Sequence, residues 1–399
     1  MIPLLLAAAL FVVDGHADTP QFLLDLGSDL TRAGDQMVDL PKARRGGLGG
    51  EFFSIWVDPD TNAGHLLQRA LDLIDAVRTQ VELHPRELRL ALTAADVEAA
   101  QKHRQLAVLM GLEGGHPLGG DLRELRNMYR LGVRYMTITW SNTNELGDSS
   151  GDIDKPNVAH HDGLTPLGRQ AVAEMNRLGM LVDVSHVADK TFFDTIEVAR
   201  APVIASHSSC RALTNHPRNM TDEMLRAVAR NGGVVMVNFF SGFVDEEFRK
   251  AFEPLRPEID KALAEVSQKY KDDPAARTRE WFAVGQRIAA RVPRPPLKSL
   301  IDHIEHVARV AGVDHAGIGS DFDGIPSLPQ GLDSAADLPK IATELRKRGF
   351  SQRDVAKIFS GNILRVMRAA ERFAQSAQLR TRSGTSSRSP DAAHRSSER

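Results

Sequence analysis

Five side chains with nitrogen or oxygen donor atoms stand where short apolar runs of this sequence end. They are His16, Asp18, Glu113, His186 and His207. A His-x-Asp pair on an extended strand directs both side chains to the same side, because the side-chain period of a strand is two, so both can bind one ion. A carboxylate such as Glu113 can bridge two cations, and the two remaining imidazoles can complete a second site. The set therefore predicts a two-metal centre.

The ligand types indicate which metal and which chemistry to expect. Nitrogen and oxygen ligands without thiolate suit Zn²⁺ in a hydrolytic role, and Mn²⁺ or Co²⁺ could occupy the same shell. The single cysteine, Cys210, is too little for a thiolate site or an intrachain disulfide. Two metals roughly 3.5–4 Å apart would share a hydroxide, lower the pKa of its parent water and polarise a scissile carbonyl. Metal-assisted hydrolysis is the expected reaction class.

Each of these features has a plainer interpretation when taken alone. A lone histidine at a strand end is more often a hydrogen-bonded structural residue than a ligand, and the run Gly111–Gly115 could be only a tight loop. The joint occurrence of five donors at strand ends favours the metal centre. His116 and His216 lie close to proposed site residues in the sequence and are candidates for a supporting role.

The elements that would position these residues are eight short apolar runs separated by amphipathic segments. The runs are Leu10–Val13, Phe52–Val57, Leu106–Leu112, Tyr135–Trp140, Leu181–Val184, Val203–Ala205, Val234–Phe239 and Ala316–Ile318. Nearly continuous Val, Ile, Leu and Met is expected where both faces of a parallel strand are buried. Eight such strands with crossovers fit a closed barrel better than an open sheet, so the prediction is an α/β fold of the (β/α)8 TIM-like type. In such barrels the chemistry collects at the carboxyl ends of the strands, where all five donors and Asp321 fall.

The domain organisation predicted from composition is one domain with a tail. Residues 241–297 are highly charged and end in a proline-rich stretch, which indicates a helical insertion between the seventh and eighth strands. The barrel is expected to span residues 1–375. Residues 376–399 are rich in Ser and Arg and almost free of apolar residues, so a disordered tail is expected there.

Charge and the amino-terminal run bear on partners and compartment. The chain has 50 Lys and Arg against 52 Asp and Glu, a net charge of −2, so it shows no general attraction to nucleic acid or anionic membranes. Residues 2–13 are apolar enough for the core of an export signal, but no basic residue precedes them and they run directly into His16. We interpret their second half as the first core strand. A shortened leader stays open, and with it a cytoplasmic or exported location; the run is too short to span a membrane.

Six short motifs in fixed order resemble the membrane (renal) dipeptidase family of metallopeptidases. They are Asp14-Gly15-His16-Ala17-Asp18, Gly111-Leu112-Glu113-Gly114-Gly115, Asp183-Val184-Ser185-His186, Ser206-His207-Ser208, Arg218-Asn219 and Gly319-Ser320-Asp321-Phe322-Asp323-Gly324. The resemblance covers roughly residues 10–370. Six motifs in the same order make it highly specific.

The resemblance implies a distorted barrel with two zinc ions that cleaves dipeptides. His16 and Asp18 would bind one ion, His186 and His207 the other, and Glu113 would bridge them. Arg218 would hold the free carboxylate of the substrate, a task that suits a planar bidentate donor. Asp321 would contact the substrate and carry the proton from the bridging water to the leaving amine, so that Asp321 and Glu113 are the expected catalytic residues. Family members often accept D-residues on the carboxyl side and often form dimers, which makes a homodimer plausible here.

One position departs from the family pattern. After the fourth strand, well-studied members carry a histidine that helps to bind the substrate, and this chain has Trp140 there. An indole N–H can donate one hydrogen bond but cannot carry a proton. We therefore expect Trp140 to be a substrate-binding residue of altered character, and Asn142, Asn144 or a loop histidine are the substitutes we consider.

Two other functions fit part of the pattern. Other barrel metal hydrolases act on cyclic amides, lactones or phosphotriesters, but those commonly use His-x-His on the first strand and a carboxylated lysine as the bridge. The second alternative is a metal-binding homologue that has lost catalysis, although all five ligands are present together with Arg218 and Asp321. Hydrolysis of a simple dipeptide with and without a chelator separates these possibilities.

Overall fold

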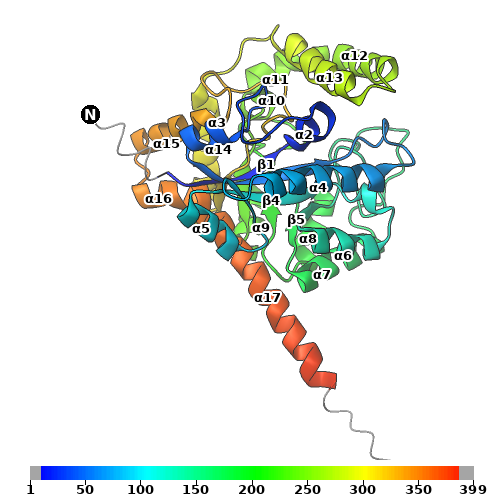
Figure 1. Ribbon diagram of the computed structural model, residues 1–399, viewed down its shortest axis with the longest axis vertical. Coiled ribbons are helices and arrows are strands. Elements are labelled where there is room, and N and C mark those ends of the chain that lie inside the picture. Colours follow the sequence, from blue (N-terminus) through cyan, green and yellow to red (C-terminus); the bar gives the residue numbers. More distant parts are fainter. Residues whose placement is uncertain (1–9, 386–399) are drawn as a thin grey trace, which may run out of the picture.

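The computed structural model describes residues 10–385, in which nine parallel strands form one sheet. The strands are β1 Val12–Ala17, β2 Leu48–Trp56, β3 Leu88–Leu90, β4 Leu106–Glu113, β5 Val133–Thr137, β6 Leu181–Asp183, β7 Ile204–Ala205, β8 Val234–Val237 and β9 Ala316–Ile318. Their order is β2-β1-β9-β8-β7-β6-β5-β4-β3, and an additional pairing of β2 with β4 closes the sheet. Figure 1 shows the labelled strands β1, β4 and β5 in the middle of the molecule, with helices around them. The closed ring contains eight strands, so the predicted (β/α)8 barrel is confirmed.

One of the nine strands, β3, was not predicted. It pairs with the first residues of β4, while β5 pairs with later residues of the same strand. The short sequence Leu88-Arg89-Leu90 has too few apolar residues to signal a buried strand, and its pairing with β4 is what orders it. It lies outside the closed ring.

The first strand also differs from the prediction in its bounds. β1 extends to Ala17, whereas the apolar run ended at Val13, so His16 lies within the strand and not after it. Asp14 is the reason that the sequence pattern stopped early, because a buried carboxylate interrupts the apolar run. Its Oδ1 accepts a hydrogen bond from the backbone N–H of Ser320 at 2.7 Å, which ties β1 to the segment just after β9.

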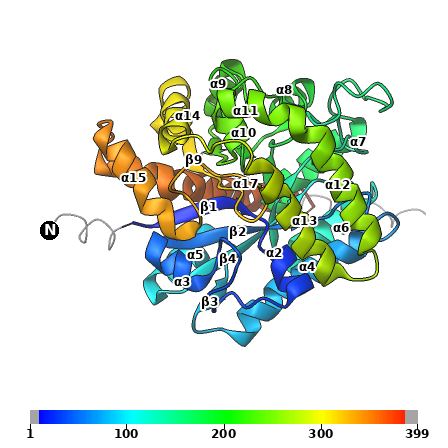
Figure 2. The same cartoon turned by 90° about the horizontal axis from the view of Figure 1, so that it is seen from above.

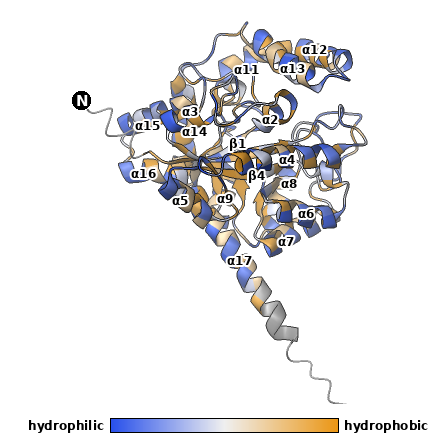
Figure 3. Cartoon of the chain, in the orientation of Figure 1, coloured by the Kyte–Doolittle hydropathy of each residue, from blue (hydrophilic) through white to orange (hydrophobic). Residues whose placement is uncertain are grey.

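The helices pack around the ring, and most of them follow a strand, as a (β/α)8 barrel requires (Figure 2). They are α2 Pro20–Leu26, α3 Leu40–Gly46, α4 Leu66–Leu83, α5 Ala94–His103, α6 Leu122–Leu131, α7 Pro166–Leu178, α8 Asp189–Val198, α9 Asp222–Asn231, α14 Leu297–Val310, α15 Leu338–Lys347 and α16 Gln352–Ala356. Thr93, Thr165 and Thr221 each cap a helix with their side-chain oxygen. Apolar residues gather on the strands and on the inner helix faces (Figure 3).

The predicted helical insertion lies between β8 and β9. It consists of α10 Ser241–Val244, α11 Glu246–Phe252, α12 Arg256–Lys269 and α13 Pro274–Ala289. The hydroxyl of Thr278 on α13 donates to Asp25 Oδ2 on α2 at 2.6 Å, and the rings of Phe22 and Phe282 lie 4.8 Å apart. These contacts attach α13 to α2, as Figure 1 also shows.

The last helix, α17, spans Asn362–Thr385 and so continues past residue 376, where the disordered tail was expected to begin. Its first turns are buried against the starts of several barrel strands, because Ile363, Leu364, Val366, Met367 and Ala370 share an apolar cluster with Val13, Ala107, Leu181 and Val234. α17 therefore covers the amino-terminal end of the barrel. Its later part projects away from the body (Figure 1).

The two ends of the chain lie outside the described residues. These ends are residues 1–9, which hold most of the run discussed as a leader, and residues 386–399, which hold most of the predicted tail. In residues 10–385, no helix is both long enough and apolar enough to cross a membrane.

Candidate active site

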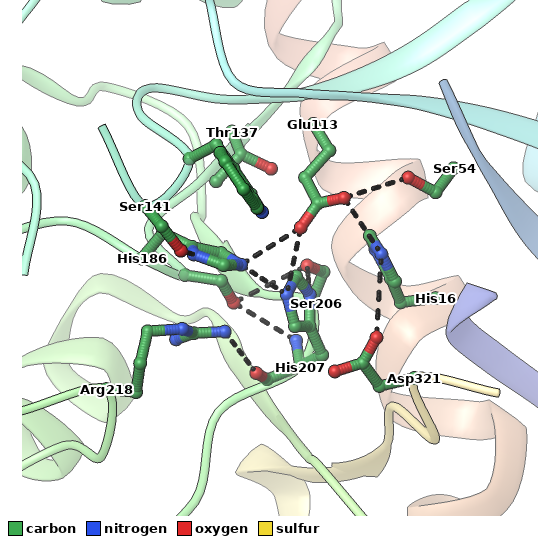
Figure 4. Close-up of polar contacts among 12 residues, drawn as sticks. His16, Ser54, Glu113, Thr137, Ser141, His186, Ser206, His207, Arg218 and Asp321 are labelled. Carbon is green, nitrogen blue, oxygen red and sulfur yellow. Dashed lines mark hydrogen bonds and ion pairs between the residues drawn. The ribbon is translucent and has the colours of Figure 1, made fainter. Parts of the chain in front are cut away.

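The five predicted ligands and Asp321 meet at the carboxyl ends of the barrel strands. Figure 4 shows His16, Glu113, His186, His207 and Asp321 pointing toward one another. His16 Nε2 lies 3.5 Å from Asp18 Oδ2, 3.4 Å from Glu113 Oε2 and 4.0 Å from Asp321 Oδ1. These residues come from β1 and the residue after it, from β4 and from the segment after β9, which the ring places close together. His16, Asp18 and Asp321 are one of the groups whose donor atoms are near enough to hold a single cation.

A second group forms on the other oxygen of Glu113. His186 Nε2 is 2.9 Å and His207 Nε2 is 3.5 Å from Glu113 Oε1. The two imidazole nitrogens are themselves 2.8 Å apart. Glu113 thus presents one oxygen to His16 and the other to the histidine pair, which is the arrangement a bridging carboxylate needs.

Buried donor atoms that lack hydrogen-bond partners provide an independent sign that divalent cations fit these residues. Among the described residues, His16 Nε2 and Asp18 Oδ1 are buried and have no hydrogen-bond partner. An unpaired buried polar atom costs about 1–3 kcal/mol, so such atoms need another partner. A Cβ added to Gly324 would lie 2.1 Å from Asp18 Oδ2 and 2.6 Å from Asp321 Oδ1, so this glycine leaves the space that the two carboxylates occupy.

The backbone at the site is held in an unusual conformation. His186 has a φ of 68° and Asp321 has a φ of 63°, values in the left-handed region that residues with a Cβ seldom adopt. Such strain costs about 1–3 kcal/mol and persists where surrounding contacts fix it, commonly at functional sites. Here the backbone carbonyl of His186 accepts a hydrogen bond from Ser150 Oγ at 2.8 Å, and Asp321 N donates to His16 O at 3.0 Å.

A hydrogen-bond chain fixes the tautomer of His207. The hydroxyls of Thr137 and Ser206 both donate to Asp183 Oδ2, at 2.5 and 2.6 Å. Because Ser206 has used its only hydrogen, its oxygen must accept the contact of 2.7 Å from His207 Nδ1. His207 Nδ1 therefore carries the proton, and Nε2 keeps a free lone pair facing Glu113 and His186.

His16 is oriented in a similar way by Tyr135, which was predicted only as part of a strand. His16 Nδ1 lies 2.7 Å from the hydroxyl of Tyr135, which is fully buried inside the barrel. A Cβ on Gly111 would come within 1.9 Å of the Tyr135 ring. The first glycine of the Gly111–Gly115 motif is therefore a strand residue that makes room for this tyrosine, and not part of a loop.

Glu113 is held as a charged group. Its Oε2 accepts a hydrogen bond from Ser54 Oγ on β2 at 3.0 Å. Burial alone would raise the pKa of Glu113, but the charge and hydrogen bonds of His16, with those of His186 and His207, outweigh burial and bring that pKa well below its usual range. The carboxylate is therefore ionised at neutral pH, as a metal ligand must be.

Arg218 and Asp321 border the same centre. Arg218 is buried, and its guanidinium donates to Ser208 Oγ at 3.3 Å and to the carbonyl of His207 at 3.1 Å, which orients it and leaves other N–H groups for a ligand. Asp321 Oδ2 accepts from Asn238 Nδ2 at 2.8 Å. Burial, helped by the charges of Asp18 and Glu113, raises the pKa of Asp321 to about 7 against the opposing effect of His16.

Trp140 lies beside the histidine pair, with its ring centre 6.4 Å from that of His186. Of the substitutes considered for the family histidine, Asn144 is occupied, because it donates to Ile138 O and accepts from Leu146 N. His161 is bound to the carbonyl of Asn144 at 3.0 Å. Asn142 Oδ1 is buried without a hydrogen-bond partner among the described residues, so Asn142 is the substitute that still has a free polar atom.

The two candidate supporting histidines are placed next to the site and not in it. His116 Nε2 lies 2.8 Å from the carbonyl of Val57. His216 Nδ1 accepts from the backbone N–H of Arg218 at 3.1 Å and its ring lies 4.6 Å from that of Phe243, so it helps to hold the loop that carries Arg218. Asp183, Ser206 and Asn238 were not predicted as site residues from the sequence. Asp183 and Ser206 belong to two of the six family motifs, a signal that could have found them, whereas Asn238 lies inside the apolar run Val234–Phe239 and belongs to no motif.

Comparison with known proteins agrees with this geometry. The family model described as membrane dipeptidase (peptidase family M19) matches residues 5–381. The chain belongs to this family. Membership makes it a metallodipeptidase, a hydrolase that acts on peptide bonds, and confirms the resemblance found from the motifs.

Individual family relatives cover nearly the whole chain. Dipeptidase verJ of Clonostachys rogersoniana is 32% identical over 377 residues, which are 90% of this chain and 84% of that protein. The crystal structure of the probable dipeptidase PvdM from Pseudomonas aeruginosa has a TM-score of 0.79 at 26% identity and covers 93% of this chain and 98% of its own. A metallopeptidase from Rhodobacter sphaeroides, solved with a phosphinate mimic of the dipeptide L-Ala-D-Ala, has a TM-score of 0.73 at 25% identity and covers 90% and 99%.

Proposed function

We propose that the protein is a zinc-dependent dipeptidase with two metal ions per chain, and that it accepts dipeptides with a D-residue at the carboxyl side. The observation that carries the proposal is the division of the donors around Glu113: one carboxylate oxygen faces His16 and the other faces His186 and His207. His16 and Asp18 would hold one ion and the histidine pair the other. The proposed acceptance of D-residues is supported by the ligand-bound relative from Rhodobacter sphaeroides.

The metal type follows from the donor set. All the donor atoms are imidazole nitrogens or carboxylate oxygens, and the only cysteine, Cys210, is buried elsewhere with its N–H bound to His303. This set suits Zn²⁺, with Mn²⁺ or Co²⁺ as substitutes. When bound, the cations supply Lewis acidity and lower the pKa of water.

The chain's own residues determine which peptides can be cleaved. Arg218 is fixed through Ser208 and the carbonyl of His207, and its remaining N–H groups would bind the terminal carboxylate of the substrate. Because this guanidinium stands beside the metal ligands, one residue fits between the carboxylate and the cut bond. A tripeptide would place its carboxylate beyond Arg218. The buried guanidinium of Arg218 would then have no carboxylate to bind.

Proton transfer falls to Asp321. Its carboxylate lies 4.0 Å from His16 Nε2 and is held by Asn238, so it can accept a proton at Oδ1 beside the centre and return it to the leaving amine. Burial raises its pKa to about 7, which suits a group that must both accept and donate a proton near neutral pH. Glu113 would stay ionised throughout and hold the ligand pair together.

The experiment that tests this function combines metal content with activity. The purified protein is assayed for zinc by elemental analysis and for hydrolysis of L,L- and L,D-dipeptides and of tripeptides, before and after chelation. About two zinc ions per chain, with dipeptide cleavage that chelation abolishes and zinc restores, supports the proposal. Bound metal without dipeptide cleavage would favour a different amide or lactone substrate, and failure to bind zinc or manganese would contradict the two-metal centre.

The homodimer that the family resemblance implies remains a prediction.

A further inference from the structure

All three tryptophans of the sequence lie in one cluster next to the metal ligands. The ring centre of Trp56 lies 5.2 Å from that of Trp140 and 5.8 Å from that of Trp281. Trp140 is the ring that lies 6.4 Å from His186. Each tryptophan is half-buried, so each ring packs on its neighbours and still offers surface. We call Trp56, Trp140 and Trp281 the tryptophan wall.

Three separate parts of the chain build this wall. Trp56 is the last residue of β2 and pairs in register with Glu113 on β4, so it stands directly beside the bridging carboxylate. Trp140 follows β5. Trp281 comes from α13, in the insertion between β8 and β9. If these rings only filled the hydrophobic core, there would be no reason for the insertion to place one of them at the ends of β2 and β5.

Specific contacts hold the wall in place. Ser149 Oγ donates to the backbone carbonyl of Trp140 at 2.5 Å and also contacts the backbone carbonyl of His186 at 3.3 Å, so one hydroxyl links the main chain at Trp140 to the main chain at a metal ligand. Trp281 is positioned by Thr278, which lies one turn earlier on α13 and donates to Asp25 on α2. The indole N–H of Trp56 is buried and has no partner among the described residues, so packing and not hydrogen bonding holds this ring.

Trp56, the member of the wall on β2, stands opposite Arg218 across the barrel. The ring order is β1, β2, β4, β5, β6, β7, β8, β9, so β2, which ends in Trp56, and β7, whose following loop carries Arg218, are diametrically opposed. Figure 4 shows the same relation, with Ser54 of β2 and Arg218 on opposite sides of the His and Glu ligands. A dipeptide whose carboxylate binds Arg218 and whose peptide bond lies at Glu113 must direct its amino-terminal residue toward β2 and β5.

We infer that the tryptophan wall binds the side chain of the amino-terminal residue and selects dipeptides in which this residue is large and apolar, above all aromatic. The inference rests on the proposed dipeptidase function and adds the substrate class. Aromatic rings bury large area and favour tilted contacts with centres 4.5–7 Å apart, the range already present within the wall. Indoles offer no charge to bind a polar side chain, so a small or acidic amino-terminal residue gains little there.

The kinetic test varies one end of the substrate at a time. For the wild type, kcat/KM should rise from Ala-Gly through Leu-Gly to Phe-Gly, by about tenfold or more overall, and should change much less between Ala-Ala and Ala-Phe. The variant Trp281→Ala should reduce the Phe-Gly to Ala-Gly ratio of kcat/KM by about tenfold. Equal rates for Ala-Gly and Phe-Gly in the wild type, or a ratio that Trp281→Ala leaves unchanged, would overturn the inference.

A matched control comes from the same insertion. Tyr270 follows α12 and stacks under Lys269, with the Lys269 Nζ 4.7 Å from its ring centre. Tyr270→Ala removes an aromatic residue of the insertion without touching the wall, and it should keep the wild-type ratio. If both variants lower the ratio equally, the insertion acts through its general docking and the wall has no direct contact with the substrate.

Fluorescence provides a readout that does not need turnover. Because the sequence has no other tryptophan, the tryptophan emission reports only on the wall. A phosphinate dipeptide mimic with a phenylalanine-like amino-terminal residue should change the emission and bind at least tenfold more tightly than the alanine-like mimic. Absence of dipeptide cleavage would contradict the proposed function alone, since the titration still decides the side-chain preference. Cleavage without that preference, in rates and in binding, would contradict only this inference.

Discussion

The Nε2 atoms of His186 and His207 lie 2.8 Å apart, and both face the same oxygen of Glu113. Burial, with the charge of Arg218 added, lowers the pKa of His186 to about 3, so its ring is neutral at pH 7. His207 carries its proton on Nδ1, and this N–H donates a hydrogen bond to Ser206 Oγ. Two lone pairs therefore converge beside a carboxylate, an arrangement that a divalent cation satisfies.

Replacing one member of this pair should remove metal. We expect His186→Ala to lower bound zinc from about two to about one per chain and to reduce kcat/KM at least a hundredfold, because one site loses a ligand and the bridge loses a partner. Elemental analysis and dipeptide assays check this. His65→Ala changes an exposed histidine that directly precedes α4, so it should retain both metal and activity. Full metal content in His186→Ala would show that His186 is not a ligand.

Tyr135→Phe should weaken metal binding without unfolding the barrel. The hydroxyl of Tyr135 lies 2.7 Å from His16 Nδ1 and fixes the orientation of that ring, and loss of such a partner typically costs 10–100-fold in metal affinity. Competition with a metal-sensitive dye measures the affinity. Tyr129→Phe is the matched control, since Tyr129 packs under Arg134 and contacts none of the ligands described. Equal affinities in the two variants would mean that the hydroxyl has no part in orienting His16.

Arg218→Lys should impair substrate binding more than turnover. A lysine keeps the charge but loses the planar donor that Ser208 and the carbonyl of His207 orient. A charge-assisted hydrogen bond is worth about 1.5–3 kcal/mol, so KM should rise about 10–150-fold. The wild type should also discriminate against a dipeptide amide, and this discrimination should shrink in the variant. An unchanged KM would place the substrate carboxylate elsewhere.

Asp321→Asn should lower kcat by about 10²–10⁴-fold and flatten the pH profile. Burial raises the pKa of Asp321 to about 7, and as a base it must be ionised. The kcat/KM of the wild type should therefore fall as the pH drops through that pKa, and bound cations move this limb below pH 7. Asn238→Ala removes a hydrogen bond to the charged form and should shift the limb to higher pH. A limb that persists in Asp321→Asn would assign it to another group.

The site was predictable where it depends on strand ends. Apolar runs locate the strands of a parallel barrel, and their carboxyl ends are where the topology gathers side chains, so donors such as Glu113 and His207 could be placed together without coordinates. Tyr135 could not be found this way, because a tyrosine inside an apolar run looks like core. Its contact with His16 exists only because Gly111 on the neighbouring strand leaves space.

The contribution of the insertion to the site could not be predicted from the sequence, for a different reason. Charge and prolines predicted helices in residues 241–297, and the structure has them. The position of Trp281 depends on docking of α13 onto α2 through Thr278 and Asp25, residues 253 positions apart in the chain. No local pattern encodes such a distant pairing. The extension of α17 to Thr385 was likewise missed, because Ser and Arg composition alone favoured disorder.

Because α17 covers the amino-terminal end of the barrel, it also determines when the molecule can complete its folding. Ile363, Leu364, Val366 and Met367 complete an apolar cluster that includes Val13 of β1, so residues synthesised after all nine strands of the described sheet complete a core that the first of these strands began. Until they emerge, the nascent barrel exposes the amino ends of its strands, a surface on which chaperones act and incomplete chains aggregate. A chain shortened before α17 should therefore fail during biosynthesis even though every metal ligand is present.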